Sequence, residues 1–336
     1  MSSARLEFES GPFFEAVRER TRAGTGRPQI EEAVRDIVAA AEGEVVGVVF
    51  FGSRRTSASG ADAHSAHDFF VLVRRYRGAY AALRRAGKTG KKPWLMAALN
   101  VLLPPSQVSL RLGRPALHAK CSVISLEAFL REASPRRRDH FCVGRLFQPS
   151  QVLHAADAET GQSILLALVR AHAATYGWVR PWLPEAFDAE AYCRTALRVS
   201  LGREIRPEPA GRAEALWSAQ REEQAPVYGR LLEELAARGE LRRVDGASYA
   251  LARPVAAGER LRLEAYFAWS LARATARWLK HVLTFEGWLD YILRKVARHT
   301  GEDIVLTPRE RRLPLLLLWP KLFRTLRRKD RPGDRA

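Results

Sequence analysis

The sequence has 336 residues, more than one hydrophobic core usually organises, so two or three compact domains are expected. Apolar residues make up 47% of the chain, which excludes disorder as its dominant state. The 55 Lys and Arg against 37 Asp and Glu give a formal charge of +18 and favour partners that carry phosphate: nucleotide, nucleic acid or anionic lipid. No run of about 18 apolar residues occurs, so a membrane-spanning helix is not expected.

Two features are typical of a protein that stays in a reducing compartment. The first ten residues, MSSARLEFES, carry early acidic side chains and no apolar core of signal-peptide length, which argues against secretion and against a mitochondrial presequence. The three cysteines cannot build a disulfide framework, and their spacing is not that of metal ligands. We therefore expect a cytoplasmic protein.

The first 155 residues alternate helices with short apolar strands. Residues 1–40 have helical spacing, and the seven apolar residues Val45 to Phe51 predict a buried strand that ends in a turn at Gly52-Ser53. Further strands are predicted from Asp68 to Val73, Gln107 to Leu112 and Ala119 to Ser125, with helices from Ala79 to Ala86 and Leu126 to Arg131. This mixture predicts a first domain, residues 1–155, built on one sheet.

The rest of the chain is mostly helical. Helices are predicted over Thr160 to Tyr176, Asp188 to Val199, Ala213 to Gln220 and Val227 to Arg238, with an extended linker from Gly202 to Pro209. Residues 241–251 then alternate around Asp245-Gly246, a strong hairpin signal. A helix followed by a two-stranded wing predicts a winged-helix-like second domain over residues 156–255. Residues 256–336 are expected to be a helical region with a basic tail.

The first candidate for chemistry lies between the first two predicted strands, where Asp68 follows Ser53 after 14 intervening residues. Nucleotidyltransferases of the polymerase-beta type use this layout: the glycine lets the backbone approach a triphosphate, the serine and turn amides bind it, and the carboxylate holds Mg²⁺. That pattern has a second carboxylate two residues after the first, where this chain has Phe70. Taken alone, the same residues also fit an ordinary strand and turn.

Two later segments strengthen the first interpretation. Lys120 opens K-C-S-V-I-S, and His140 opens H-F-C-V-G-R-L-F-Q-P, which contains Arg145. These segments resemble the paired signature of the mitochondrial-type phosphatidate cytidylyltransferases, the CDP-diacylglycerol synthases of the translocator-assembly-and-maintenance family. That family has a K-x-x-V-I-S strand and, after one helix, a G-R-L-x-x-P segment. A weaker likeness continues from Leu197 to Tyr249, so the resemblance covers about residues 45–250.

The resemblance implies a fold and a reaction. The fold would be α+β: a nucleotidyltransferase-type mixed sheet domain, a helical winged-helix-like domain and a C-terminal amphipathic helix. The reaction would convert CTP and phosphatidate to CDP-diacylglycerol and pyrophosphate, with Mg²⁺, at the inner face of a bacterial cell membrane. A phosphate monoester has a second pKa of about 6, so this nucleophile is largely ionised at neutral pH and needs no general base.

The resemblance also implies roles for individual residues. Asp68 would hold the metal, Gly52 and Ser53 the triphosphate, and Lys120 and Arg145 would bind and neutralise the developing negative charge. Plainer interpretations stay open: Lys120 as a solvated cation at the end of a strand, and Arg145 as a structural ion-pair partner.

The chain departs from the family pattern at two places. Arg74-Arg75 follow the Asp strand, where the family commonly has further acids, so metal ligation by protein is thin. Asn100 to Ser106 replaces a Gly-rich segment, which leaves the cytosine contacts unassigned. Arg54 and Arg55 fit phosphate ligands and surface charge equally well.

The C-terminal tail predicts contact with a membrane. Residues 309–336 hold ten Lys and Arg and three acids, and apolar residues recur on one helical face. A basic amphipathic helix with aromatic residues is typical of an interfacial anchor, as opposed to a helix packed on its own domain. The predicted membrane-binding residues are Trp319, Lys321, Phe323, Arg324, Arg327 and Arg328.

Two other functions compete with this prediction. One is a nucleotidyltransferase that acts on another acceptor, such as a different phospholipid or RNA. The other is a non-catalytic winged-helix protein that binds nucleic acid, motivated by Phe70, the charge of +18 and the hairpin. We consider nucleic acid the less favoured partner, and the sequence leaves the oligomeric state open.

Overall fold

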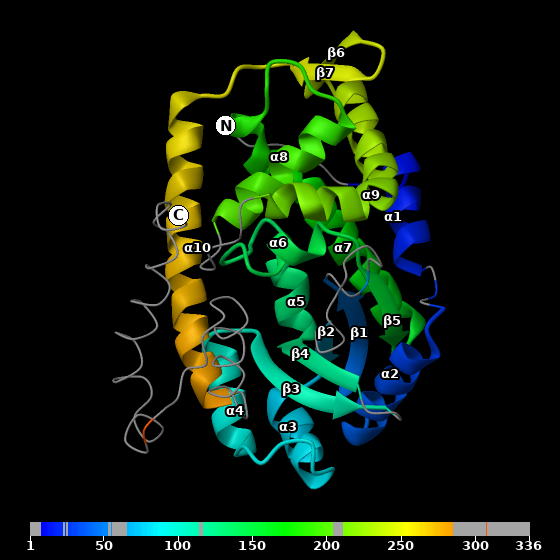
Figure 1. The fold of residues 1–336 in the computed structure, drawn as a ribbon, viewed down its shortest axis with the longest axis vertical. Coiled ribbons are helices and arrows are strands. Elements are labelled where there is room, and N and C mark those ends of the chain that lie inside the picture. Colours follow the sequence, from blue (N-terminus) through cyan, green and yellow to red (C-terminus); the bar gives the residue numbers. More distant parts are fainter. Residues whose placement is uncertain are drawn as a thin grey trace, which may run out of the picture. The chain divides into compact units, whose positions relative to one another are not determined.

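A computed structural model describes residues 8–22, 24, 26–52, 55, 66–113, 117–203, 211–284 and 307 (Figure 1). The protein is α+β. Its elements are α1 (Pro12–Arg22), α2 (Pro28–Ala40), β1 (Val45–Phe51), β2 (His67–Val73), α3 (Tyr76–Arg85), α4 (Pro93–Leu102), β3 (Ser106–Leu112), β4 (Leu117–Ser125), α5 (Leu126–Glu132), α6 (Val143–Leu146), β5 (Gln151–Ala155), α7 (Ala158–Val179), a 3₁₀ turn (Arg180–Trp182), α8 (Ala189–Gly202), α9 (Arg212–Ala237), β6 (Leu241–Asp245), β7 (Ser248–Leu251) and α10 (Ala257–Thr284).

Five of these strands form one mixed sheet in the order β3-β4-β2-β1-β5. Strand β2 runs parallel to β4, whereas β1 is antiparallel to β2 and β5, and β3 is antiparallel to β4. The four strands predicted in this region are confirmed. The fifth, β5, was not predicted, because its residues QVLHA form a short edge strand that is mostly half-buried.

Helices cover both faces of the sheet, and the two faces differ in their partners. Side chains from alternate strand positions pack with α2, α3 and Met96 of α4 on what we call the α2/α3 face. The other positions pack with α1, α5 and α7 on the α5/α7 face. The central strands read as continuous apolar runs because both of their faces are buried.

The hydrophobic core on the α5/α7 face continues into the helical part of the chain, where it includes residues of α8, α9 and the hairpin. Helix α9 is continuous, whereas two helices were predicted, and Pro226 lies inside it. Trp217 on one side of the proline and Tyr228 on the other are both buried, and this shared packing offsets the backbone hydrogen bond that proline cannot make. The predicted helix over residues 188–199 is confirmed as α8.

The predicted hairpin is also confirmed. Strands β6 and β7 pair around the turn at Asp245-Gly246, and Tyr249 bonds in both directions to the backbone of Phe187 before α8. One compact unit comprises residues 1–280 and a second comprises residues 281–336. The domain boundaries predicted from the sequence stay predictions, and within the described ranges no helix has the length and apolarity needed to cross a bilayer.

Candidate functional site

Three of the predicted site residues meet at one end of the sheet. Strand β1 ends at Phe51, which pairs with Asp68 near the start of β2. Asp68 in turn pairs with Lys120 on the parallel strand β4. Register partners project from the same face, so the carboxylate and the ammonium group belong to the α5/α7 face, directly after the turn that begins at Gly52. Both side chains are half-buried.

Gly52 is required at this place by conformation and by space. Its φ of +88° lies in the left-handed region, where residues with a side chain are strained. A Cβ atom built there would lie 2.8 Å from Oδ2 of Asp68. The backbone at the end of β1 therefore lies so close to the Asp68 carboxylate that a side chain at position 52 would overlap it. The next residue, Ser53, lies outside the described residues.

The Asp68 carboxylate has no hydrogen bond or ion pair with any residue that the structure describes. This is uncommon for a half-buried acid, because a charge withdrawn from water loses solvation that a partner normally replaces. Elsewhere in the described chain, buried carboxylates such as those of Asp139 and Glu132 are held by arginines or backbone amides. Asp68 is thus available to a ligand.

The face around Lys120 is polar, a feature that the sequence interpretation missed. Strand β3 places Gln107 opposite Ser122, and Ser109 opposite Lys120. The intervening residues of β3, Val108 and Leu110 among them, are buried on the α2/α3 face. The half-buried Gln107 and Ser109 therefore extend the site beside Asp68 and Lys120, whereas Ser122 is 1% exposed and lies beneath it. The alternation S-Q-V-S-L-R-L was the signal that could have found them.

Phe70 occupies the position at which the nucleotidyltransferase pattern has its second carboxylate, and in this structure it is a core residue. Its ring stacks on Phe51 with centroids 4.6 Å apart, and meets Phe129 of α5 edge-on at 5.7 Å. The side chain is fully buried. Position 70 belongs to the hydrophobic core beneath the site, so a carboxylate there would be buried among rings.

Among the described residues, a divalent cation at this site would find one carboxylate, that of Asp68. Within the described part of the chain, no three His, Cys, Asp or Glu residues cluster as metal ligands. Mg²⁺ usually keeps several waters and takes one or two carboxylates plus phosphate oxygens from a nucleotide. The unpartnered Asp68 fits that donor set as a single ligand, and it does not fit a metal held by protein alone.

Arg145, the third predicted cation, has other described contacts. It lies on α6, where its Nη1 donates a hydrogen bond of 2.9 Å to the carbonyl of Phe141. Its guanidinium carbon lies 3.9 Å from the centre of the Phe141 ring. No hydrogen bond or ion pair joins it to Asp68 in the described residues. The structure thus brings Gly52, Asp68 and Lys120 together, and it holds the Arg145 side chain against Phe141 of the loop before α6.

The same loop carries a buried charge network that attaches α10. Arg277 and Arg273 contact Oδ2 of Asp139 at 2.6 and 2.7 Å, and Arg277 also stacks on Phe141. Burial opposes ionisation of Asp139, but the two arginines hold its pKa below the ordinary value. Burial, together with the neighbouring Arg277 and Arg273, lowers the pKa of Lys280 to about 6. The amine of Lys280 donates to the carbonyls of Leu103 and Pro105.

His140 sits inside this network as a neutral side chain. Burial first, and then the charges of Arg137 and Arg145, lower its pKa to about 3. Its Nε2 lies 3.1 Å from the hydroxyl of Ser200, and its ring meets Trp178 edge-on. The His140 of the family-like segment is therefore a core residue, positioned to support α6.

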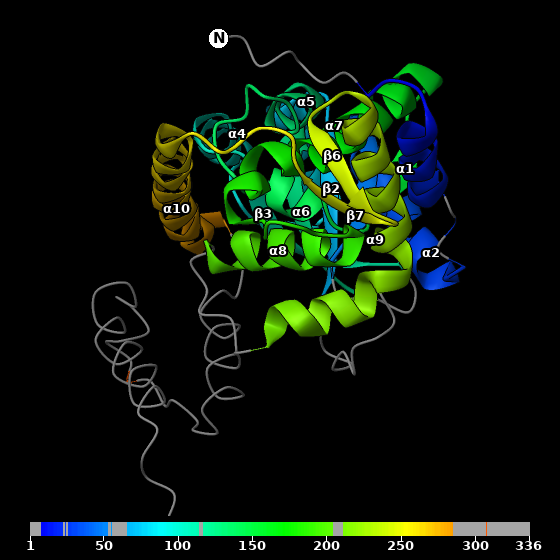
Figure 2. The ribbon, with the colours of Figure 1, turned by 90° about the horizontal axis from the view of Figure 1, so that it is seen from above.

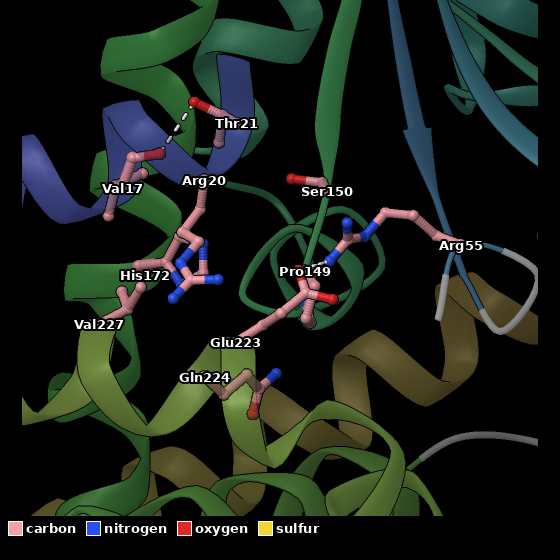
Figure 3. Close-up of a pocket in the computed structure, with 10 residues that line it drawn as sticks. All are labelled: Val17, Arg20, Thr21, Arg55, Pro149, Ser150, His172, Glu223, Gln224 and Val227. Carbon is pink, nitrogen blue, oxygen red and sulfur yellow. Dashed lines mark hydrogen bonds and ion pairs between the residues drawn. The ribbon is translucent and has the colours of Figure 1, made fainter. Parts of the chain in front are cut away.

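Arg55 is neither a surface charge nor directed at the sheet end. Its side chain is buried and forms an ion pair with Glu223 of α9 (Figure 3). Beside the pair lies a cavity of about 20 Å³, lined also by Ser150 and His172. This volume holds roughly one water molecule and excludes a nucleotide. The tail residues Trp319, Lys321, Phe323, Arg324, Arg327 and Arg328, and also Arg54, lie outside the described residues.

Comparison with known proteins adds no family to these observations. No model of a protein family matches the chain, and no curated protein is significantly similar to it.

Proposed function

We propose that the protein is a nucleotidyltransferase that uses CTP and phosphatidate to make CDP-diacylglycerol and pyrophosphate. The observation that carries the proposal is the half-buried carboxylate of Asp68, which has no partner among the described residues and is flanked by the left-handed Gly52 and by Lys120 on the next strand. Nucleotidyl transfer needs a carboxylate that binds a metal ion, a backbone segment without side chain that a triphosphate can approach, and a cation that neutralises the phosphate charge.

In this reaction a phosphate oxygen of phosphatidate forms a bond to the α-phosphorus of CTP. The bond from that phosphorus to the bridging oxygen breaks, and pyrophosphate leaves with the electron pair. The nucleophile is already ionised at neutral pH, so the site needs no histidine or glutamate as a base. This agrees with the surroundings of His140, whose low pKa and core packing suit a structural role.

Each residue then has a limited task. The backbone at Gly52 lies against the triphosphate, and Lys120 neutralises charge that moves toward the leaving group. Asp68 would hold Mg²⁺, which, when bound, neutralises the phosphates and stabilises the departing pyrophosphate. Ser109 and Gln107 supply a hydroxyl and an amide group for the nucleotide on the same face. For Arg145 we propose a positioning role through Phe141, or direct contact with phosphate.

The acceptor and the location belong to the same proposal. Phosphatidate is a membrane lipid, so the enzyme works as a peripheral protein on the inner face of the bacterial cell membrane. The basic tail, with ten Lys and Arg among residues 309–336, supports this location, because cations near an anionic leaflet contribute about 1 kcal/mol each.

The test is an assay of the full chain with CTP, Mg²⁺ and phosphatidate vesicles, following pyrophosphate and CDP-diacylglycerol. We expect product from the wild type and at least about a hundredfold loss in Asp68→Asn and Lys120→Met. The matched controls are Asp245→Asn in the hairpin turn and Arg198→Gln on α8, both exposed and distant in the chain from the site. Activity that survives Asp68→Asn contradicts the proposal, and so does an inactive wild type. A panel of other phospholipids and RNA identifies a different acceptor.

A second candidate function rests on the hairpin. Strand β6 exposes Arg242 and Arg243 beside α9, as the wing of a DNA-binding winged helix would. Under this alternative the protein binds duplex DNA with a strong dependence on salt, and Asp68→Asn has no effect. Replacing Arg242 and Arg243 by Gln would then weaken binding, while titration calorimetry would detect no CTP binding.

A further inference from the structure

Helix α4 buries a hydrogen-bonded polar side chain and exposes several large apolar side chains. Its buried side holds Asn100, whose amide donates bonds of 3.0 Å to the hydroxyl of Tyr80 and the carbonyl of Val123. Trp94, Val101 and Leu102 are 59, 66 and 74% exposed, and Ala98 is exposed between them. These four residues have the spacing i, i+4, i+7 and i+8, which is one face of a helix. We call them the α4 outer face.

An apolar stripe of this kind normally packs into a core. Here the core positions of α4 are already filled by Met96 and Asn100, so the stripe serves something outside. The helix contains no charged residue. Its C-terminal end lies beside α10 (Figures 1 and 2), whose Lys280 donates to the carbonyls of Leu103 and Pro105. Leu279, the residue before Lys280, is also exposed.

The chain on either side of α4 carries positive charge, part of which is paired: Arg75, Arg85 and Lys88 bind Glu44, Glu42 and Asp36. The 58 residues between Asp68 and Glu127 contain eleven Lys and Arg and not one acid. Lys91 and Lys92 immediately precede α4, and Lys92 is exposed. Neither forms an ion pair with a residue that the structure describes. Apolar side chains with a tryptophan, next to unpaired lysines, complement an anionic lipid surface: the rings and aliphatic groups enter the interface and the ammonium groups meet phosphates.

The charge also argues against other occupants. A second copy docked on the same face would set two positive patches, each with Lys91 and Lys92, against each other, and like charges repel. The C-terminal residues 309–336 carry a net charge of +7 and would meet the same repulsion. Nucleic acid would engage the lysines and leave three large apolar side chains in water. We infer that the α4 outer face and Lys91-Lys92 dock the protein on an anionic membrane, whatever reaction the sheet end performs.

The test places a probe on the α4 outer face. All three native cysteines are buried, so a cysteine introduced as Val101→Cys can be labelled selectively with a fluorophore. The control is Val244→Cys on the hairpin, where the valine is 46% exposed. On phosphatidylglycerol vesicles that contain no phosphatidate, we expect quenching of the label at 101 by aqueous iodide to fall about threefold or more. Quenching at 244 should stay unchanged, and phosphatidylcholine vesicles should protect neither position.

Several results would overturn the inference. Vesicle binding through the tail alone would leave the label at 101 as accessible as the label at 244. Protection without vesicles would mean that the chain covers its own face, and protection that grows with protein concentration would mean a second copy. Independently, Leu102→Glu should weaken partition onto phosphatidylglycerol vesicles about tenfold or more, while Val244→Glu leaves it unchanged. Equal thermal unfolding of the two glutamate variants separates this loss from misfolding, and an undiminished partition of Leu102→Glu contradicts the inference.

Discussion

Gly52 and Asp68 approach so closely that a methyl group on the glycine would overlap the carboxylate, 2.8 Å from Oδ2. Gly52→Ala should therefore displace Asp68, and the left-handed φ adds strain, so we expect a loss of about 1–3 kcal/mol in the free energy of unfolding. The matched control is Gly87→Ala: its φ is +67°, but a Cβ there has no neighbour within 4 Å. Urea titration measures both variants. An equal loss of unfolding free energy in Gly52→Ala and Gly87→Ala would mean that backbone strain accounts for the whole effect and that the overlap with Asp68 contributes nothing.

The pair of Asp139 with Arg277 should contribute strongly to stability. Asp139→Asn leaves two largely buried guanidinium groups, those of Arg277 and Arg273, without their carboxylate. Uncompensated buried charge typically costs about 3–5 kcal/mol. Removing the exposed pair of Glu42 and Arg85 by Glu42→Gln should leave the free energy of unfolding almost unchanged. Chemical denaturation of both variants checks the contrast, and a small effect of Asp139→Asn would show that water reaches the arginines.

His172 should make the fold sensitive to mild acid. Burial lowers the pKa of its imidazole to about 4, and Nδ1 lies 3.1 Å from the hydroxyl of Tyr228, which donates to the carbonyl of Phe147. The unfolded chain binds a proton near pH 6.5, so between pH 6.5 and 4 it holds more protons than the folded chain. The free energy of unfolding therefore falls as the pH falls through this window, by about 3 kcal/mol from this residue, and is unaffected above it.

The measurement for His172 compares unfolding free energies at pH 7.5 and 4.5 in the wild type and in His172→Gln, which does not titrate. We expect a smaller difference in the variant. Part of the acid dependence should remain, because burial and neighbouring arginines also lower the pKa of His140, to about 3. An identical pH dependence in both proteins would show that the folded protein accommodates a charged His172.

Pro226 should be a site where stability can be gained. It lies exposed inside α9, where proline removes one helical hydrogen bond and crowds the preceding turn. Pro226→Ala restores the amide, and we expect thermal unfolding to show a gain of about 1–2 kcal/mol after the looser unfolded state is taken into account. Pro254→Ala, outside any helix, should show no gain. A loss at 226 would show that α9 needs the bend.

The sequence predicted the central strands well because their residues report burial directly. Val45–Phe51 and Phe69–Val73 are apolar at every position, since both faces of the sheet are covered. It failed for α4, whose residues PWLMAALNVL have outward apolar positions and no caps that mark a helix. It failed for β5 because an edge strand needs only a few apolar contacts, so its composition resembles that of a loop.

The site was predictable in part. Asp68, Lys120 and Gly52 could each be proposed from local motifs. That Asp68 and Lys120 are register partners depends on the pairing of β2 with β4, which joins residues 52 positions apart and which no local pattern encodes. For Arg145, the sequence predicted the charge but not the contact that the side chain makes. A cation in a motif predicts a charge near the site, while its stacking on Phe141 follows from the three-dimensional packing of the loop before α6.

Glu234 of α9 accepts a hydrogen bond of 2.9 Å from the amide of Phe13, in the first turn of α1. The two ends of this bond are 221 residues apart in the chain. During synthesis at about 5–20 residues per second, α1 waits roughly 11–44 s before its partner leaves the ribosome. Until α9 has been synthesised, the side of α1 that packs against it stays exposed on the nascent chain.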